Sequence, residues 1–146
     1  MKDTLWINEI NNEKIIDYKR LKGGVSSQVY RVKTNKKIYC VKRSLSKLLV
    51  KKDWFADTKR LKYEYYWLKH CKKIIPKSIP NILQFNAKKD FLILEYLDEK
   101  KYDTLKSHLL KKDINLKIIK KISKDIFKIH KESSGLKIKK KFKDNF

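Results

Sequence analysis

The chain has 146 residues, and its 39 Lys and Arg against 16 Asp and Glu give a formal net charge of +23. This length fits one ordinary domain, and 41% hydrophobic with 12% aromatic residues exclude a disordered tail. No apolar run approaches the roughly 18 residues that cross a bilayer, and the first residues lack the apolar core of a signal peptide. Because Cys40 and Cys71 make no disulfide framework, we expect a cytoplasmic protein.

The excess of positive charge favours a polyanionic partner such as nucleic acid, because basic surfaces attract phosphate backbones. Only four of the basic residues are arginine, however, and arginine is the side chain that makes bidentate contacts with phosphates and bases. The lysines extend along the whole chain beside many Ile, Asn, Phe and Tyr residues, as an A/T-biased genome would produce. A lysine-rich background and a polyanion-binding role both stay open at this point.

The first 17 residues look like a polar lead-in whose isoleucines share one helical face: Ile10, Ile15 and Ile16. Three stretches rich in β-forming residues follow, at 18–21, 28–33 and 38–42. Gly, Ser and Asn residues between them predict turns. We therefore expect an antiparallel meander with short connections.

A helix is predicted over residues 56–71, where apolar side chains recur at helical spacing and Asp57 can cap the first turn. Two prolines then end the helical pattern. Residues 82–86 and 91–95 predict a β-hairpin with a four-residue turn. After a polar connector, a second helix is predicted over 115–131, with an apolar stripe formed by Ile119, Ile122, Ile126 and Ile129.

Three features in this series could carry chemistry. The glycine turn between the first two strands exposes backbone N–H groups to a phosphate, but it lacks the ending of a P-loop, and an ordinary hairpin turn explains it equally well. Lys42 ends the third strand, where a solvated lysine is the ordinary finding. Glu64 lies on the apolar face of the first helix, where a carboxylate either reaches solvent or takes a cationic partner. Their order along the chain is that of the small lobe of a kinase-like fold.

With these motifs the chain resembles the N-terminal lobe of the aminoglycoside phosphotransferase-like family, which includes methylthioribose and choline kinases. The resemblance covers about residues 18–134. Leu21–Val32 matches the family's phosphate-binding hairpin, and Cys40–Leu48 matches its lysine strand and the residues that leave that strand. Asp53–Asp57 with Arg60 and Glu64 matches the start of its helix, and Leu94–Leu97 matches its hinge.

The resemblance implies an α+β fold, a protein-kinase-like small lobe with a five-stranded antiparallel sheet and one helix. The first helices of a truncated large lobe would follow. The corresponding divisions are a lead-in at 1–17, an ATP-binding lobe at 18–97, and a hinge with the start of an incomplete helical lobe at 98–146.

The resemblance also implies roles toward ATP. Lys42 would contact the α- and β-phosphates, and Glu64 would pair with Lys42 and fix its position. The glycine turn would cover the phosphates through four residues, Gly23, Gly24, Ser26 and Ser27. Side chains of the sheet and backbone groups of the hinge would hold the adenine, with Val29 and Cys40 above it, Leu94 behind it, and Glu95 and Leu97 hydrogen-bonding its edge.

The implied activity is transfer of the ATP γ-phosphate to a hydroxyl of a small molecule, which needs an aspartate and Mg²⁺ ligands from the large lobe. After Leu97 no such motif is found: no Asp follows His108 at the right place, and Asp125 is expected to be solvated within a helix. We therefore assign no catalytic residue and no metal ligand, and expect a truncated or split protein that is inactive alone. A separately encoded large lobe is then an expected partner.

Two other functions stay open. A small basic nucleic-acid-binding protein would lose affinity steeply as salt is added, because its binding neutralises phosphates. A non-catalytic partner of a full-length kinase would keep the kinase-like surface without the chemistry.

Overall fold

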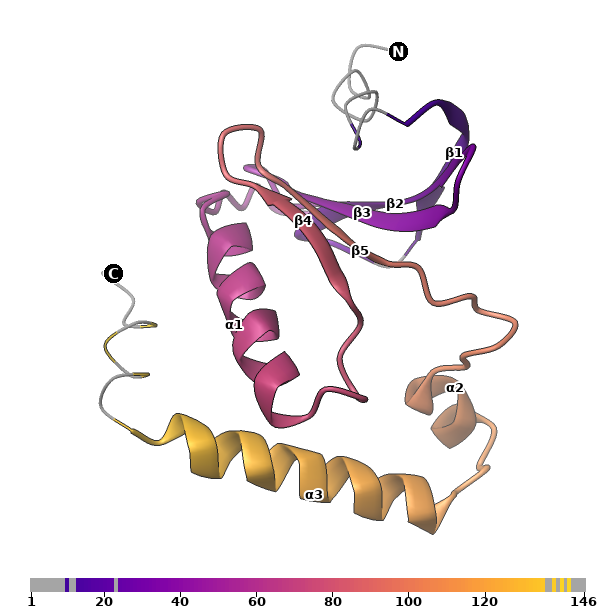
Figure 1. The fold of residues 1–146 in the computed structure, drawn as a ribbon, viewed down its shortest axis with the longest axis vertical. Coiled ribbons are helices and arrows are strands. Elements are labelled where there is room, and N and C mark those ends of the chain that lie inside the picture. Colours follow the sequence, from indigo (N-terminus) through magenta and orange to yellow (C-terminus); the bar gives the residue numbers. More distant parts are fainter. Residues whose placement is uncertain are drawn as a thin grey trace. The chain divides into compact units, whose positions relative to one another are not determined.

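The computed structural model describes residues 10, 13–22, 24–135, 138, 140 and 142. Within them lie five strands and three helices (Figure 1), in the order β1 (Ile15–Leu21), β2 (Ser27–Thr34), β3 (Ile38–Ser44), α1 (Arg60–Ile74), β4 (Ile82–Asn86), β5 (Phe91–Glu95), α2 (Leu105–Leu110) and α3 (Leu116–Ser133). None of the helices in this described part is long and apolar enough to cross a membrane.

The chain divides into two compact units. The first comprises Met1–Tyr66 with Pro80–Tyr96, and the second comprises Trp67–Ile79 with Leu97–Phe146, so that the division falls within α1. The domain boundaries expected from the sequence stay a prediction.

The strands of the first unit form one antiparallel sheet in the order β1-β2-β3-β5-β4. Helix α1 follows β3 in the chain and begins beside β4 (Figure 1), where the Tyr65 ring stacks on the Phe85 ring at 4.6 Å between centroids. The predicted α+β fold, a five-stranded antiparallel sheet with one helix between β3 and β4, is confirmed.

Two predicted hairpin turns are confirmed, and polar side chains close both. The Thr34 hydroxyl accepts hydrogen bonds from the backbone N–H groups of Lys36 and Lys37 at 3.2 and 3.1 Å, between β2 and β3. In the turn between β4 and β5, the Asn86 side-chain oxygen accepts the N–H groups of the two lysines that follow. Asp90 completes that turn at φ 54°, in the left-handed region that Asp tolerates better than most residues.

The hydrophobic core of the first unit covers one face of the sheet. Because strand side chains alternate between faces, every second residue of the central strands belongs to this core. It consists of Tyr30, Val32, Tyr39, Val41, Phe91 and Ile93, closed by Ile10. The opposite face is left for α1 and for the candidate site.

Strand β1 and helix α1 begin at residues other than those predicted from the sequence. Ile15 and Ile16 belong to β1 rather than to a helix, because Ile15 pairs with Thr34 in the ladder to β2. Helix α1 begins at Arg60 rather than near residue 56, because the preceding residues form a turn. In that turn the Asp57 carboxylate accepts the N–H of Lys59 at 2.8 Å.

The hydrogen-bonded carboxylate of Glu13 should make the stability of the first unit depend on pH. Its carboxylate accepts the hydroxyls of Thr34 and Tyr39 at 2.6 and 2.7 Å, and these bonds, that from Thr34 first, hold the pKa of Glu13 below its usual value. Because the pKa of Glu13 is lower in the folded than in the unfolded state, ionised Glu13 stabilises the fold at pH values above its unfolded pKa, near 4.5. This stabilisation is lost as the pH falls through the pKa that Glu13 has in the folded state. The melting-temperature gap between the wild type and Glu13→Gln should therefore be widest near neutral pH and close in acid. A gap that stays constant from pH 7 to pH 3 would contradict this role.

In the second unit, Thr104 and Asn115 cap the starts of α2 and α3, each accepting backbone N–H groups with its side chain. The predicted second helix is thus confirmed as α3. Its half-buried stripe differs from the expected one, because Ile126 is 48% exposed and Asp125 lies among the half-buried residues. Asp125, expected to be solvated, keeps 19% of its side chain exposed and is thus only partly solvated.

Asp125 is anchored by two neighbours. Its carboxylate accepts the Ser78 hydroxyl at 2.6 Å and forms an ion pair with Lys121, one turn earlier in α3. The hydrogen bond from Lys121, followed by that from Ser78, lowers the pKa of Asp125. These contacts give Asp125 a structural function within the second unit.

Candidate functional site

Lys42 and Glu64 form the pair predicted from the sequence. The Lys42 ammonium Nζ lies 2.7 Å from both carboxylate oxygens of Glu64, so the contact is bidentate. The two side chains are 24% and 35% exposed, which leaves one side of the pair open to solvent. Residues from β3 and the first turns of α1 thus meet across 22 positions of sequence.

The sheet register places the other predicted residues around this pair. Lys42 is paired with Val29 of β2 and with Leu92 of β5, and in the next row of the same face Cys40 is paired with Leu94. Because opposite residues in a ladder share a face, four predicted site residues lie on the face opposite the core. Val29, Cys40 and Leu94 are half-buried and form an apolar floor beside the lysine.

Burial has a chemical effect on the thiol of this floor. It raises the pKa of Cys40, and Glu64 adds to the rise while Lys42 opposes it. The thiol is therefore neutral at physiological pH and serves as an apolar surface rather than as a nucleophile.

The glycine turn is fastened to the segment that follows β3. The Leu49 N–H donates to the Val25 carbonyl at 2.8 Å, and the Leu45 N–H donates to the Ser26 carbonyl at 3.0 Å. Gly24 and Ser26 lie in this turn, whereas Ser27 is buried as the first residue of β2. Gly23 lies outside the described residues.

Gly24 is required by close packing. A Cβ placed on it would lie 2.9 Å from the backbone carbonyl oxygen of Ser27, so Gly24→Ala must displace the turn. We expect a loss of about 1–3 kcal/mol in unfolding free energy, the usual cost of overpacking, measured by chemical denaturation. Gly135→Ala is the matched control, since no described atom lies within 4 Å of that Cβ. Equal effects of the two substitutions would contradict the role given to Gly24.

Arg60 is a site residue whose function the sequence did not reveal. Its guanidinium donates to the carbonyl oxygens of Ser26 in the glycine turn and Leu45 after β3. It also donates to the carbonyls of Ala56 and Asp57, which precede α1. One planar side chain therefore joins the turn, the exit of β3 and the start of α1. With the Ser26 carbonyl bound to Arg60, the turn is fixed to the start of α1.

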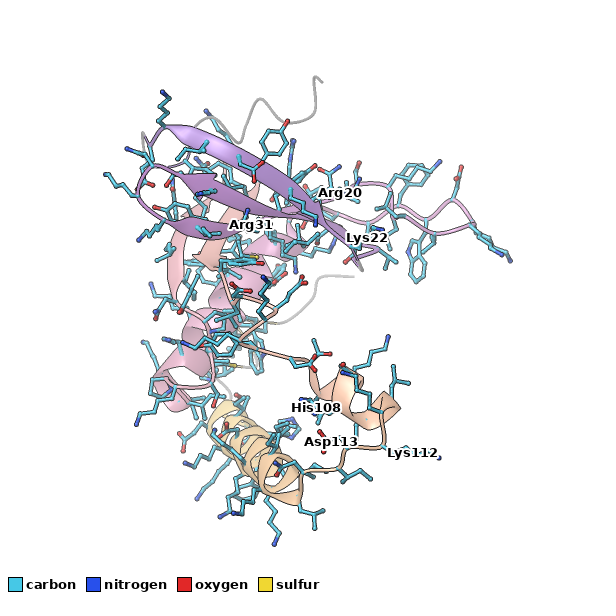
Figure 2. All side chains as sticks on the ribbon, turned by 90° about the vertical axis from the view of Figure 1, so that its right-hand side faces the viewer. Arg20, Lys22, Arg31, His108, Lys112 and Asp113 are labelled. Atoms are coloured by element: carbon cyan, nitrogen blue, oxygen red, sulfur yellow. The ribbon has the colours of Figure 1, made fainter. Side chains whose placement is uncertain are left out.

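Arg31 is a second residue that sequence reasoning did not assign. It lies in the row of Cys40 and Leu94 on the site face (labelled in Figure 2), beside the predicted adenine residues. Its guanidinium pairs with Asp17 at 3.3 Å and lies over the Tyr96 ring at 5.7 Å from the centroid. Arg31 thus links β1 to the residue that follows β5.

The predicted hinge residues begin at the end of β5. Leu94 lies on the face of the sheet opposite the core, with the other candidate site residues. Glu95 is held by Asn81: the Asn81 N–H donates to the Glu95 carboxylate, and the Asn81 carbonyl accepts the Glu95 N–H. Leu97 follows two residues later, belongs to the second unit and is 41% exposed.

His108 in the second unit has an aspartate partner that its sequence spacing did not suggest. Its Nδ1 lies 2.6 Å from the Asp113 carboxylate (both labelled in Figure 2). The Asp103 carboxylate lies 3.8 Å from its Nε2. The Asp113 N–H also donates to the His108 carbonyl, and Lys112 between them has φ 59°. The cluster closes the turn after α2, so we assign it a structural role.

The described residues do not fit the Mg²⁺ that the family resemblance implies. Among them no three His, Cys, Asp or Glu side chains gather into a group that could hold a metal ion. No step of the chemistry below is therefore assigned to a metal held by these residues.

The chain resembles solved structures but no described protein family. No family model matches the chain, and no curated protein matches it. The fold is similar to the crystal structure of a candidate fructosamine-3-kinase from Thermobifida fusca YX-ER1, with a TM-score of 0.45 and 14% sequence identity over 66% of this chain. The chain spans 31% of the length of that protein, or about a third.

Proposed function

We propose that this chain is the ATP-binding lobe of a phosphotransferase of the aminoglycoside phosphotransferase-like family. The observation that carries the proposal is the bidentate Lys42–Glu64 pair, which lies beside an apolar floor on the open face of the sheet. The complete reaction would break the bond between the γ-phosphorus and its bridging oxygen. It would form a phosphate ester on a small-molecule hydroxyl and release ADP and the hydroxyl proton.

The residues of this chain would bind and orient the nucleotide. Lys42 would donate hydrogen bonds to the α- and β-phosphates, because an ammonium held by a carboxylate keeps its position. The floor of Val29, Cys40 and Leu94 would take the adenine ring, with Arg31 at its edge. The turn at Gly24 and Ser26, fixed by Arg60, would lie over the phosphates. The acceptor hydroxyl would belong to the small-molecule substrate, and the base that takes its proton would be provided by residues other than these.

Titration with a fluorescent ATP analogue carrying N-methylanthraniloyl tests the proposal. We expect saturable binding that unlabelled ATP and ADP reverse, and much weaker competition by adenosine, which lacks the phosphates that Lys42 would contact. Competition by inorganic triphosphate as strong as that by ATP would show simple attraction to the +23 charge. That result, or the lack of saturable binding, would overturn the proposal.

A further inference from the structure

Helix α3 carries its lysines on one face. The helix has 3.6 residues per turn, which places all six lysines within an arc of about 100°. They are exposed, and together they form what we call the lysine face: Lys117, Lys120, Lys121, Lys124, Lys128 and Lys131. The acidic residues of α3 are Asp125 and Glu132, and Asp125 is already bound to Ser78 and Lys121.

Two open hollows run along the lysine face within the second unit. The larger, about 960 Å³, is lined by Lys124, Lys128 and Lys131 of α3 together with Lys73 of α1 and the ring of Phe127. The smaller, about 500 Å³, is lined by five of the six lysines and by Asp125. They share Lys124 and Lys128, so the two form a continuous basic surface.

We propose that the lysine face binds the phosphodiester backbone of single-stranded nucleic acid, with Phe127 stacking on a base. From Lys117 to Lys131 the helix rises about 21 Å at 1.5 Å per residue, so one ammonium occurs roughly every 4 Å. That density is close to that of the phosphates of one stacked strand, which recur about every 3.4 Å along its axis. Phe127 is 67% exposed at the larger hollow, and exposed aromatic rings beside basic grooves are the usual stacking platforms for bases.

A membrane surface is the other anionic partner that a basic amphipathic helix could take. Such binding needs the apolar face of the helix to enter the lipid. In α3 that face is partly in use, because Ile119, Ile122 and Ile129 are half-buried, whereas Leu116, Ile118, Ile126 and Phe127 are exposed. A hydrogen bond between His70 and Ser133 and one from Ser78 to Asp125 also hold the same helix within its own unit. The central isoleucines of that face are therefore less available than the six lysines, all of which are exposed.

The test compares two variants of equal charge. One replaces Lys117, Lys124 and Lys128 by glutamine, and the other replaces three exposed lysines of the first unit by glutamine: Lys19, Lys33 and Lys88. Each has a net charge of 23 − 3 = +20. Glutamine keeps the helix propensity of lysine, and circular dichroism checks that both variants fold. Binding of a fluorescein-labelled 20-mer of deoxythymidine is followed by anisotropy from 50 to 300 mM NaCl.

For the wild type we expect log affinity to fall against log salt with a slope of about −4, which is −0.7 for each of six neutralised phosphates. The variant on α3 should bind at least tenfold more weakly at 100 mM NaCl with a slope near −2, and the first-unit variant should stay within about threefold. Phe127→Ala should weaken binding of the oligonucleotide about five- to tenfold and leave binding of inorganic polyphosphate unchanged.

Three results would overturn the proposal. Equal weakening in the two charge-matched variants would show that only the total charge attracts the oligonucleotide. No binding by the wild type would exclude the partner. Binding to vesicles with 30% phosphatidylglycerol that depends on the α3 lysines, without binding to the oligonucleotide, would assign the face to a membrane. Each variant should still bind the fluorescent ATP analogue, so this outcome is independent of the nucleotide proposal.

Discussion

Replacing Lys42 by alanine is expected to lower the affinity of the chain for ATP by about 10- to 100-fold. This corresponds to roughly 1.5–3 kcal/mol, the range of hydrogen bonds to charged groups. Lys42 lies on the site face with its ammonium held 2.7 Å from Glu64, so no other described lysine is fixed in the same way beside Val29 and Leu92. Isothermal titration calorimetry with ATP at 150 mM salt measures the loss.

Lys88→Ala is the matched control, because Lys88 is an exposed lysine in the turn between β4 and β5 and has the same charge. It should change the ATP affinity less than twofold. If both substitutions weaken binding equally, ATP is attracted by the overall charge, and the assignment of Lys42 is wrong.

Glu64→Gln separates two functions of the carboxylate. If Glu64 acted only as a negative charge near the phosphates, its neutralisation would strengthen ATP binding. If it positions Lys42 through the bidentate contact, the loss of that anchor should weaken binding, and we expect a decrease of about three- to tenfold. An increase in affinity would contradict the positioning role.

Replacing Arg60 by alanine is expected to destabilise the first unit by about 2–4 kcal/mol. The guanidinium donates to four backbone carbonyls in three segments, and hydrogen bonds to charged groups contribute about 1.5–3 kcal/mol each when removed one at a time. The ATP affinity should fall as well, because the turn would lose the hydrogen bond that holds its Ser26 carbonyl. Urea denaturation followed by tryptophan fluorescence measures the first effect, and calorimetry measures the second.

Two further variants test why an arginine is required at this position. Arg60→Lys should recover less than half of the lost stability, because one ammonium cannot reproduce the planar fork of five donors. Arg20→Ala on the exposed surface of β1 should cost less than about 0.5 kcal/mol. Full rescue by lysine would show that the charge alone matters and that the hydrogen-bond geometry does not.

The elements held by local interactions were the ones that sequence reasoning could predict. The hairpin of β4 and β5 was predicted at its observed bounds, because Asn86 and Asp90 close its turn within a few residues. The Lys42–Glu64 pair was found from the order of motifs, since each residue alone has an ordinary explanation. The same order predicted the antiparallel sheet.

Contacts between distant segments decided the rest. The extension of β1 to Ile15 depends on its pairing with Thr34, and the half-buried place of Asp125 depends on Ser78, 47 residues earlier. Arg60 bonds only to backbone carbonyls in the contacts described here, and a carbonyl has no side-chain signature in the sequence. Its function could therefore not be predicted from residue types.

The alternation of side chains in β3 separates two kinds of mutational effect. Tyr39 and Val41 point into a core that Ile10 closes without any ligand, whereas Cys40 and Lys42 lie on the face of the candidate site. Substitutions scanned along this strand should therefore change folding at odd positions and nucleotide binding at even positions. A single-residue deletion in β3 would exchange the two sets of side chains and would be more damaging than any one substitution.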